Sequence, residues 1–232
     1  MKMPEYEKLP KELQCDEVKL YYNILKTKTS GLVLKRIFDI VVAIFLIILL
    51  ALPMLVIAVL IKCTSKGPVI YKQVRVTTFG KEFKIFKFRS MRTDADAKGE
   101  LLTVGEDNRI TKIGKFIRKF RLDELPQIFH VLSGKMSIVG TRPEVPKFTD
   151  KYTNDMLATL LLPAGVTSLA SIKFKDEAEL LAEAEDVDKA YVEQILPEKM
   201  KYNLEYIKKF SFWGDIKLIF KTVAEVFTSR GE

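Results

Sequence analysis

Hydrophobic and polar positions divide the chain into three stretches of different character. The first 30 residues mix polar and apolar positions, which predicts a loosely ordered or weakly helical arm over 1–30. An unbroken apolar run follows from Ile40 to Ile61, 22 residues without a polar side chain. Shorter alternating and helical patterns fill the rest. We therefore expect an arm over 1–30, a membrane helix over 31–62 and one further domain over 63–232.

The apolar run has the length of a membrane helix but contains a proline. A straight helix of 22 residues would reach roughly 33 Å, enough to cross a hydrocarbon core. Pro53 has no N–H and its ring crowds the carbonyl of Leu49, so the helix should kink or break there. Both flanks are basic, with Lys35 before the run and Lys62 after it, and basic residues prefer the cytoplasmic side. Two topologies remain open: a single-pass anchor, and a re-entrant helix that bends at Pro53 and leaves through the face it entered.

Beyond the membrane segment the pattern predicts a small β-hairpin and then helices. Residues 69–76 and 81–88 alternate apolar and polar positions around the turn TTFG, with Phe83 and Ile85 facing inward. Residues 111–120 have an apolar stripe among basic positions. Such a basic amphipathic helix would lie at the membrane interface or pack against the hairpin.

The remaining pattern is helical apart from one loop. A short helix should begin near Asp123 and end before Gly134, and the glycine- and proline-punctuated run 137–146 should form a loop. In the C-terminal third, Trp213 and Phe220 belong to apolar sets that suit a core or a membrane interface. The expected fold class is α+β, mainly helical with a small β-hairpin, on a proline-broken membrane helix and interfacial amphipathic helices.

Composition and charge narrow the class of protein. No cleavable signal peptide is expected, because the first 36 residues carry eight Lys/Arg and five Asp/Glu. Cys15 and Cys63 are too few for a disulfide framework, which indicates a reducing, cytoplasmic setting. The net charge is +8, and residues 62–121 hold 16 Lys/Arg against 6 Asp/Glu. This basic block should face anionic lipid or a phosphorylated substrate; nucleic acid is not expected, because no module that binds it is recognisable.

Several kinds of active site can be excluded. The chain has one histidine, His130, which excludes a multi-histidine metal site, and we interpret it as a packing residue on the short helix. No G-x-G-x-x-G or Walker A loop is present. Asp94 and Asp96 form an Asp-x-Asp pair that could hold a divalent ion, although surface loops often carry such pairs.

The run RLDELPQ at 121–127 is the stronger candidate for chemistry. Asp123 is well placed as the N-cap of the following helix, which would explain it without any chemistry. A helix N-terminus also attracts phosphate, and Arg118 and Arg142 could hold phosphate oxygens bidentately. A carboxylate beside such cations stays ionised and could attack phosphorus, while Glu124 could hold a magnesium ion.

These features occur in an order that resembles the bacterial sugar transferase family, the monotopic phosphoglycosyl transferases. The order is an apolar segment with a helix-breaking proline, FKFRSM at 86–91, RLDELPQ at 121–127 and SGKMSIVGTRPE at 133–144. The resemblance covers roughly 33–227. No segment of the larger multi-span or extra-domain forms precedes it, so we expect a member of the small class.

The resemblance implies a two-step reaction. Asp123 would attack the β-phosphate of a UDP-sugar, UMP would leave, and a polyprenol phosphate would then take the phosphosugar from the aspartate. Glu124 would be the ligand of Mg²⁺. Lys87, Arg89, Arg118 and Arg142 would contact phosphate.

The family also implies a setting. The helix around Pro53 would be re-entrant, and the protein would be monotopic in the bacterial inner membrane, in contact with membrane lipid, with its catalytic domain facing the cytoplasm. The sugar, the polyprenol length, the pathway served and the formation of a homo-oligomer stay open. Two alternatives also remain: a membrane-tethered module that binds anionic lipid, and a magnesium-dependent phosphatase without a lipid acceptor.

Overall fold

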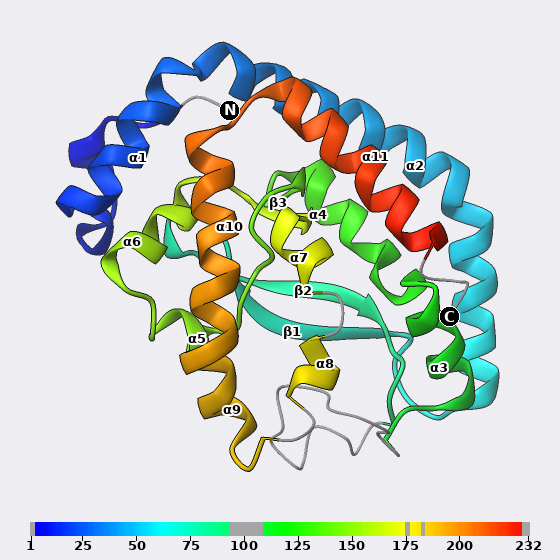
Figure 1. Ribbon diagram of the computed structural model, residues 1–232. Helices are drawn as coiled ribbons and strands as arrows, with labels where there is room; N and C mark the ends of the chain where they lie inside the picture. The colour runs from blue at the N-terminus through cyan, green and yellow to red at the C-terminus, as the bar shows by residue number, and fades with distance from the viewer. Residues whose placement is uncertain (1–2, 93–108, 175–176, 182–183, 229–232) are drawn as a thin grey trace.

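The long apolar run forms one helix, α2 (Thr29–Thr64), with Pro53 inside it. The structure is a computed structural model that describes residues 3–92, 109–174, 177–181 and 184–228, so Asp94 and Asp96 lie outside the described residues. Within those ranges α2 is the one helix long and apolar enough to cross a membrane. Figure 1 shows α2 running along the top of the molecule and then down its right-hand side. The helix thus changes direction but is not interrupted at Pro53.

The first strand pair confirms the predicted hairpin. Strands β1 (Ile70–Val76) and β2 (Glu82–Phe88) are antiparallel, with Ile70 opposite Phe88. The turn contains η3 (Thr78–Gly80). Phe83 and Ile85 are buried, as the alternation predicts.

A second strand pair was not predicted. Strands β3 (Met136–Val139) and β4 (Ala164–Thr167) are parallel, so the start of the expected loop at 137–146 is a strand. Gly140 and Gly165 lie back to back just beyond Val139: a Cβ at Gly165 would be 2.2 Å from the Gly140 nitrogen. The close approach of the two backbones therefore requires glycine.

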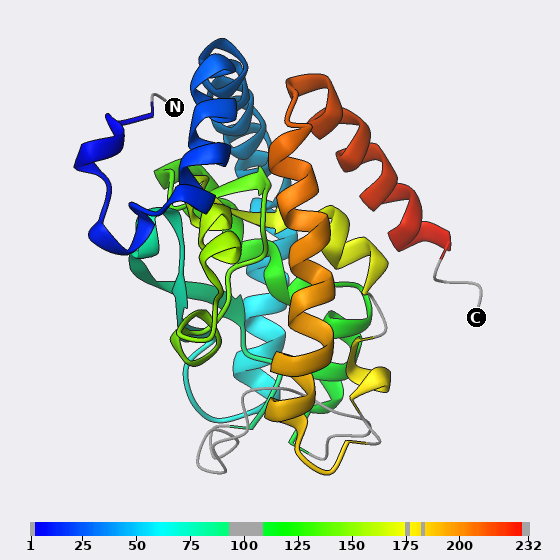
Figure 2. The same ribbon diagram turned by 60° about the vertical axis from the view of Figure 1, so that its left-hand side comes forward.

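Helices make up the rest of the domain, and the fold is mainly helical as expected. Figures 1 and 2 show α10 (Leu196–Lys208) crossing one face of the molecule, with α11 (Phe212–Thr228) following it. The further elements are α3 (Lys112–Lys119), η5 (Leu122–Gln127), α4 (Ile128–Ser133), α5 (Pro146–Thr149), α6 (Asn154–Leu157), η6 (Ala158–Leu161), α7 (Leu169–Lys173), α8 (Glu177–Leu180), α9 (Val187–Ala190), the π-helical η7 (Tyr191–Ile195), α10 (Leu196–Lys208) and α11 (Phe212–Thr228).

The N-terminal arm is more ordered than the sequence pattern predicts. It forms η1 (Tyr6–Lys8), η2 (Lys11–Leu13) and α1 (Asp16–Thr27). In α1, Val18, Tyr22 and Leu25 are buried in one cluster with Ile207 of α10 and Leu161 of η6. Of the two expectations for this arm, the loosely ordered one was wrong and the helical one was right, because one face of α1 is apolar at helical spacing and packs on the domain.

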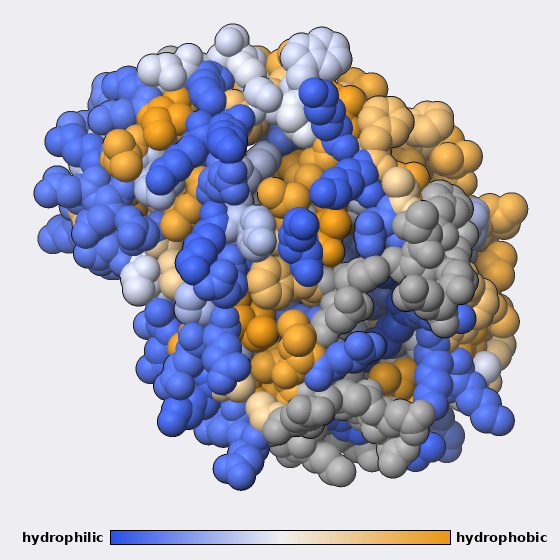
Figure 3. Space-filling model, in the orientation of Figure 1, coloured by the Kyte–Doolittle hydropathy of each residue, from blue (hydrophilic) through white to orange (hydrophobic). Residues whose placement is uncertain are grey.

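Both ends of α2 are buried against the same domain, whereas most of its middle is exposed. Leu32 and Ala43 are buried before the bend, and Ile57 and Ile61 are buried after it, Ile61 in a cluster with residues of β2 and α3. Between them a few side chains are partly buried against the domain, but most are exposed, and Ile48 has 73% of its surface accessible. Figure 3 shows hydrophobic surface along the upper right and right-hand margin of the molecule, where Figure 1 places α2. An exposed apolar surface of this kind is typical of contact with lipid.

Candidate active site

The carboxylate pair lies in the short connection between α3 and α4. Thr111 caps α3, its Oγ1 accepting from the Gly114 N–H at 2.9 Å. The chain then turns at Arg121, which has φ 52°, and enters the 3₁₀ helix η5 that contains both acids. Asp123 is therefore inside η5 and is not an N-cap, contrary to the expectation. The left-handed residue at Arg121 occupies that position instead.

Glu124 holds the cations of the site. Its Oε1 accepts from Lys87 Nζ at 3.0 Å, and its Oε2 accepts from Arg142 Nη1 at 3.0 Å. Arg142 Nη2 donates a second hydrogen bond to Oε1, which makes the pair bidentate. Burial would raise the pKa of the Glu124 carboxyl, but Arg142 and Lys87 outweigh burial and hold that pKa well below its ordinary value. Glu124 is therefore ionised.

Asp123 lies beside these ion pairs but outside them. It is only 9% exposed, and the three cation contacts just described all end on Glu124. Burial raises the pKa of the Asp123 carboxyl, and the charge of Glu124 adds to this effect. Lys87, Arg118 and Arg142 act in the opposite direction without cancelling it. We expected the basic cluster to lower the pKa of Asp123, but the pKa that it lowers below the ordinary value is that of Glu124.

The structure brings together five of the six residues expected in the site. Lys87 comes from β2, Arg142 from the loop after β3, and the half-buried Arg118 from α3, where its charge acts on Asp123. With the two acids of η5 they form one cluster from four parts of the fold.

Arg89 is the exception. Its guanidinium is buried and donates to the carbonyl oxygens of Ser65 and Lys66, both at 2.9 Å, and to Ser65 Oγ at 2.7 Å. Arg89 therefore binds the chain just past the end of α2 and does not join the carboxylate pair. Strand β2 ends at Phe88, so the alternation that would place Arg89 beside Lys87 stops before it.

His130 has the packing role expected from the sequence. It is buried, and its ring packs against the rings of Phe83 and Phe86, whose centroids lie 5.2 and 4.4 Å from the His130 ring centroid. Its Nε2 accepts from the backbone N–H of Phe86 at 3.1 Å, which requires a neutral ring. Burial, with a smaller effect of Lys135, lowers the pKa of His130 to about 4.

The acids of the site fit a magnesium ion that arrives with phosphate rather than a dedicated metal cage. A carboxylate oxygen has two lone pairs: both on Glu124 Oε1 are used by Lys87 and Arg142, whereas Oε2 has one left. In the described part of the chain, no cluster of three or more His, Cys, Asp or Glu is suited to a metal ion. Magnesium commonly binds through one or two carboxylates plus substrate phosphates, so the pair at Asp123 and Glu124 meets this minimum.

Sequence reasoning assigned no role to a second buried polar cluster beside the Arg142 loop. It contains Glu144, Tyr191 and Lys199. Glu144 is visible in the motif GTRPE, but its partners are more than 40 residues away, so no local spacing reveals them.

Comparison with known proteins gives one family. Residues 30–229 match the model of a family described as bacterial sugar transferase. UDP-glucose:undecaprenyl-phosphate glucose-1-phosphate transferase of Klebsiella pneumoniae is 38% identical over 204 residues, 86% of this chain and 41% of that protein. UDP-N-acetylgalactosamine-undecaprenyl-phosphate N-acetylgalactosaminephosphotransferase of Aeromonas hydrophila is 36% identical over 201 residues, 85% of this chain and 44% of that protein. The chain thus spans less than half the length of these two relatives.

A shorter relative is more similar over a shorter stretch of the chain. The putative undecaprenyl-phosphate N-acetylgalactosaminyl 1-phosphate transferase of Bacillus subtilis is 48% identical over 134 residues, which are 57% of this chain and 74% of that protein.

Proposed function

This chain belongs to the bacterial sugar transferase family, and on that premise we propose that it transfers a sugar phosphate from a UDP-sugar to a polyprenol phosphate and releases UMP. The Klebsiella and Aeromonas relatives are named for a UDP-sugar and for undecaprenyl phosphate, and the Bacillus relative for undecaprenyl phosphate, which supports both substrate classes. The observation that carries the proposal is that cations bind one of two adjacent acids, Glu124, and not the other, Asp123.

This difference in bound cations indicates which acid is the nucleophile and which acid binds cations. Glu124 is bound by Lys87 and Arg142, so each of its oxygens already accepts a hydrogen bond from a cation. Asp123 is nearly buried and lies outside those ion pairs. A nucleophile needs an available oxygen close to cations that bind the electrophile, and Asp123 meets this requirement.

The reaction then proceeds in two displacements. An oxygen of the ionised Asp123 attacks the β-phosphorus of the UDP-sugar, the bond from that phosphorus to the bridging oxygen breaks, and UMP leaves with the bonding electrons. A phosphosugar-aspartate remains. An oxygen of the polyprenol phosphate attacks the same phosphorus and displaces the Asp123 carboxylate, which gives the polyprenol diphosphate sugar and restores the enzyme.

The cations keep donors for the phosphates. Lys87 has three N–H groups and uses one on Glu124, and Arg142 has five and uses two there. Arg118 adds a further guanidinium near Asp123. A magnesium ion held by Glu124, and by Asp123 before it reacts, would neutralise charge on the diphosphate.

The membrane arrangement that we propose is re-entrant and monotopic, in the bacterial inner membrane with the site on the cytoplasmic side. The two ends of α2 are packed on one domain and most of its apolar middle is exposed. Trp213 and Phe220 of α11 are 72% and 70% exposed, which supports a position of α11 in the membrane interface. A lipid acceptor in the same leaflet could then reach Asp123.

The test is UMP release by the purified protein from a panel of UDP-sugars, with and without polyprenol phosphate. Without acceptor, one equivalent of UMP or less should appear, and intact-protein mass spectrometry should find a phosphosugar adduct. Asp123→Asn should abolish both. Glu124→Gln should lower the rate and the magnesium dependence but keep the adduct on Asp123.

The alternatives give other results. A lipid-binding module would bind anionic vesicles equally well with Asp123→Asn and would release no UMP in either form. A phosphatase would release free sugar phosphate in many turnovers without polyprenol phosphate. An adduct on Glu124, or turnover without any adduct, would contradict the assignment of the nucleophile.

A further inference from the structure

A buried charged cluster adjoins the proposed active site but takes no part in the reaction described above. Glu144 Oε1 accepts from the Tyr191 hydroxyl at 2.6 Å and lies 3.4 Å from Lys199 Nζ. Lys199 also donates to the Tyr191 oxygen and to Glu177 Oε2, both at 2.9 Å. All but Glu177 are buried. The cluster joins η7, α8 and α10 to the loop after β3.

Glu144 is two residues from Arg142, in a segment without helix or strand. The backbone of this segment is held from β1: the Val76 N–H donates to the Glu144 carbonyl at 2.9 Å, and Arg75 Nη1 donates to the Pro143 carbonyl at 3.1 Å. Its side chains are held from α10 through Glu144. The loop that carries Arg142 is therefore fixed at Glu144 from two directions.

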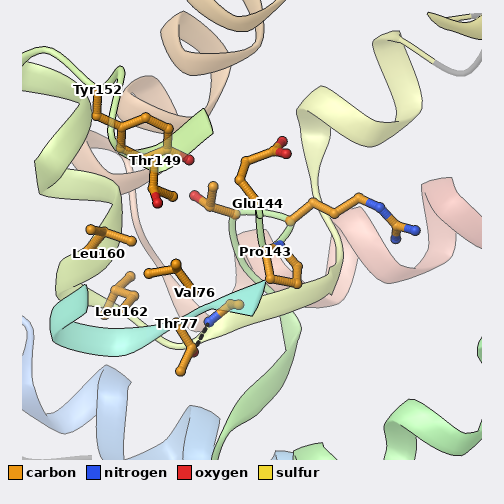
Figure 4. A pocket seen from close by; sticks show the side chains of 11 residues that line it. Val76, Thr77, Pro143, Glu144, Thr149, Tyr152, Leu160 and Leu162 are labelled. Carbon is orange, nitrogen blue, oxygen red and sulfur yellow. Dashed lines mark hydrogen bonds between the residues drawn. The ribbon is translucent and has the colours of Figure 1, made fainter. Parts of the chain in front are cut away.

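The surroundings leave the loop little freedom. Figure 4 shows Glu144 and Pro143 on one side of a small cavity, with Leu160 and Leu162 on the other side. The cavity volume is about 10 Å³, which is room for about one water molecule. Burial would raise the pKa of the Glu144 carboxyl, but Lys199 and Arg75 lower it below the ordinary value. A buried carboxylate that stays ionised must keep these partners, which specifies the position of the loop.

We propose that Glu144, held by Tyr191 and Lys199, is a positioning residue that sets the guanidinium of Arg142 against Glu124. Glu144 touches neither carboxylate of the proposed site and acts through the two-residue segment that links it to Arg142. This inference rests on the proposed function only for its kinetic readout. Displacement of a positioned group by about 1 Å can cost up to a hundredfold in rate.

The test is a double-mutant cycle on single-turnover UMP release. Glu144→Gln should lower the rate by about tenfold or more. In an Arg142→Lys background the same change should cost little, because the bidentate guanidinium is already absent. In an Arg118→Lys background it should cost its full factor. Glu205→Gln, on the exposed side of the same helix as Lys199, is the matched control and should leave the rate unchanged.

A milder variant and a second readout keep the test decisive. Tyr191→Phe removes one hydrogen bond to Glu144 and should show a smaller loss with the same dependence on Arg142. Arginine modification by phenylglyoxal, read by peptide mapping, should increase at Arg142 in both variants and not at Arg36, which binds the Val131 and Leu132 carbonyls elsewhere.

The outcomes separate the two proposals. If Glu144→Gln lowered the rate by the same factor in the Arg142→Lys and Arg118→Lys backgrounds, the positioning role would be overturned. It would also be overturned if Glu144→Gln lowered the unfolding temperature but left the rate and the modification of Arg142 unchanged. If the parent protein released no UMP from any UDP-sugar, the proposed function would fail, and the modification experiment alone would decide the role of Glu144.

Discussion

Asp123 and Glu124 are neighbours in sequence, yet they experience different local fields. Successive residues of a helical turn point in different directions, so Lys87 and Arg142 can bind one acid without binding the other. Their bonds stabilise the charge of Glu124, and that fixed charge in turn raises the pKa of Asp123. A buried carboxylate with few partners is a more reactive base than one that is fully paired. The difference between the two residues is thus electrostatic, not chemical.

A first prediction concerns the arginines at the same scale. Arg142→Lys keeps the positive charge but loses the bidentate contact with Glu124, and Arg118→Lys loses the planar fork near Asp123. Each change should lower turnover by about an order of magnitude or more, with an unchanged unfolding temperature as the control. Normal kinetics in both lysine variants would remove the arginines from the site.

A second prediction concerns His130 and pH. Its pKa of about 4 in the folded protein is below the ordinary value of 6.5, so the unfolded chain binds more protons between these values. The stabilising effect is complete above pH 6.5 and is lost as the pH falls through 4, by about 3 kcal/mol at most. Denaturant unfolding at pH 7 and pH 5 should show a smaller pH dependence in His130→Asn than in the parent. Equal pH dependence in both proteins would refute the neutral buried histidine.

The sequence predicted which residues lie together better than it predicted their contacts. The acids, Lys87 and Arg142 belong to short motifs, and the structure places them together. Arg89 looked equivalent to Lys87, but it lies beyond the end of β2 and binds the chain after α2. The groups that hydrogen-bond the Glu144 side chain come from residues after 176, and long-range hydrogen bonds of this kind leave no periodic signal in a single sequence.

At the scale of elements, glycines let the backbone of β4 approach the residue just after β3 very closely. A Cβ at Gly165 would lie 2.2 Å from both the nitrogen and the oxygen of Gly140, atoms that cannot rotate away. At Gly80, by contrast, a Cβ would meet nothing within 4 Å, and only its φ of +74° is unfavourable.

A third prediction follows from this contrast. Gly165→Ala should lower the free energy of unfolding by about 3 kcal/mol or more, because the two strands must separate to admit the methyl group. Gly80→Ala should lower it by about 1 kcal/mol through backbone strain alone. Guanidinium unfolding of the detergent-solubilised variants measures both. Similar losses at the two positions would mean that the strands can separate at little cost.

The elements that the sequence predicted are those with local signals. The hairpin of β1 and β2 alternates over seven residues a strand around a short turn, so its pattern is self-contained. Strands β3 and β4 have four residues each and pair across 24 intervening residues, so neither has enough alternation to be recognised. Helix α1 was underestimated although Val18, Tyr21, Tyr22 and Leu25 follow helical spacing, because the many polar residues around them masked the apolar face.

At the scale of the whole molecule, α2 is tied to the domain by buried charges as well as by apolar packing. Lys35 Nζ donates to Asp215 of α11 at 2.6 Å and to the Val139 carbonyl at 2.8 Å. Asp39 accepts from Ser137 Oγ at 2.7 Å. Lys35 is therefore not a free juxtamembrane cation, and its charge is weak evidence on topology. The packing of both ends of α2 on one domain is the stronger evidence for a re-entrant helix. A straight helix of 36 residues would be about 54 Å long and would hold its two ends that far apart.

The last prediction is that the two ends of α2 and the domain lie on the same side of the membrane. Cys63 is exposed just before the end of α2, Ser30 is exposed near its start, and Asn154 is exposed on the domain. With Cys15 replaced by serine, three proteins each carry one reporter cysteine: Cys63 itself, or Ser30→Cys or Asn154→Cys in a chain without Cys63. In intact spheroplasts all three should be protected from a membrane-impermeant thiol reagent, and all three should react after permeabilisation.

Pro53 supplies the matched perturbation for this experiment. Pro53→Ala provides the N–H that the Leu49 carbonyl lacks and removes the ring that bends the helix, so it favours a straight span. A fraction of the Ser30→Cys protein should then react from outside, at the cost of the contacts that Leu32 and Lys35 make with the domain. Reaction of Ser30→Cys from outside in the parent, with Cys63 and Asn154→Cys protected, would establish the single-pass topology instead. In that case the packing of both ends of α2 on one domain could not exist in the membrane, and the lipid acceptor would have to reach Asp123 without the guidance of a helix that returns to the same face.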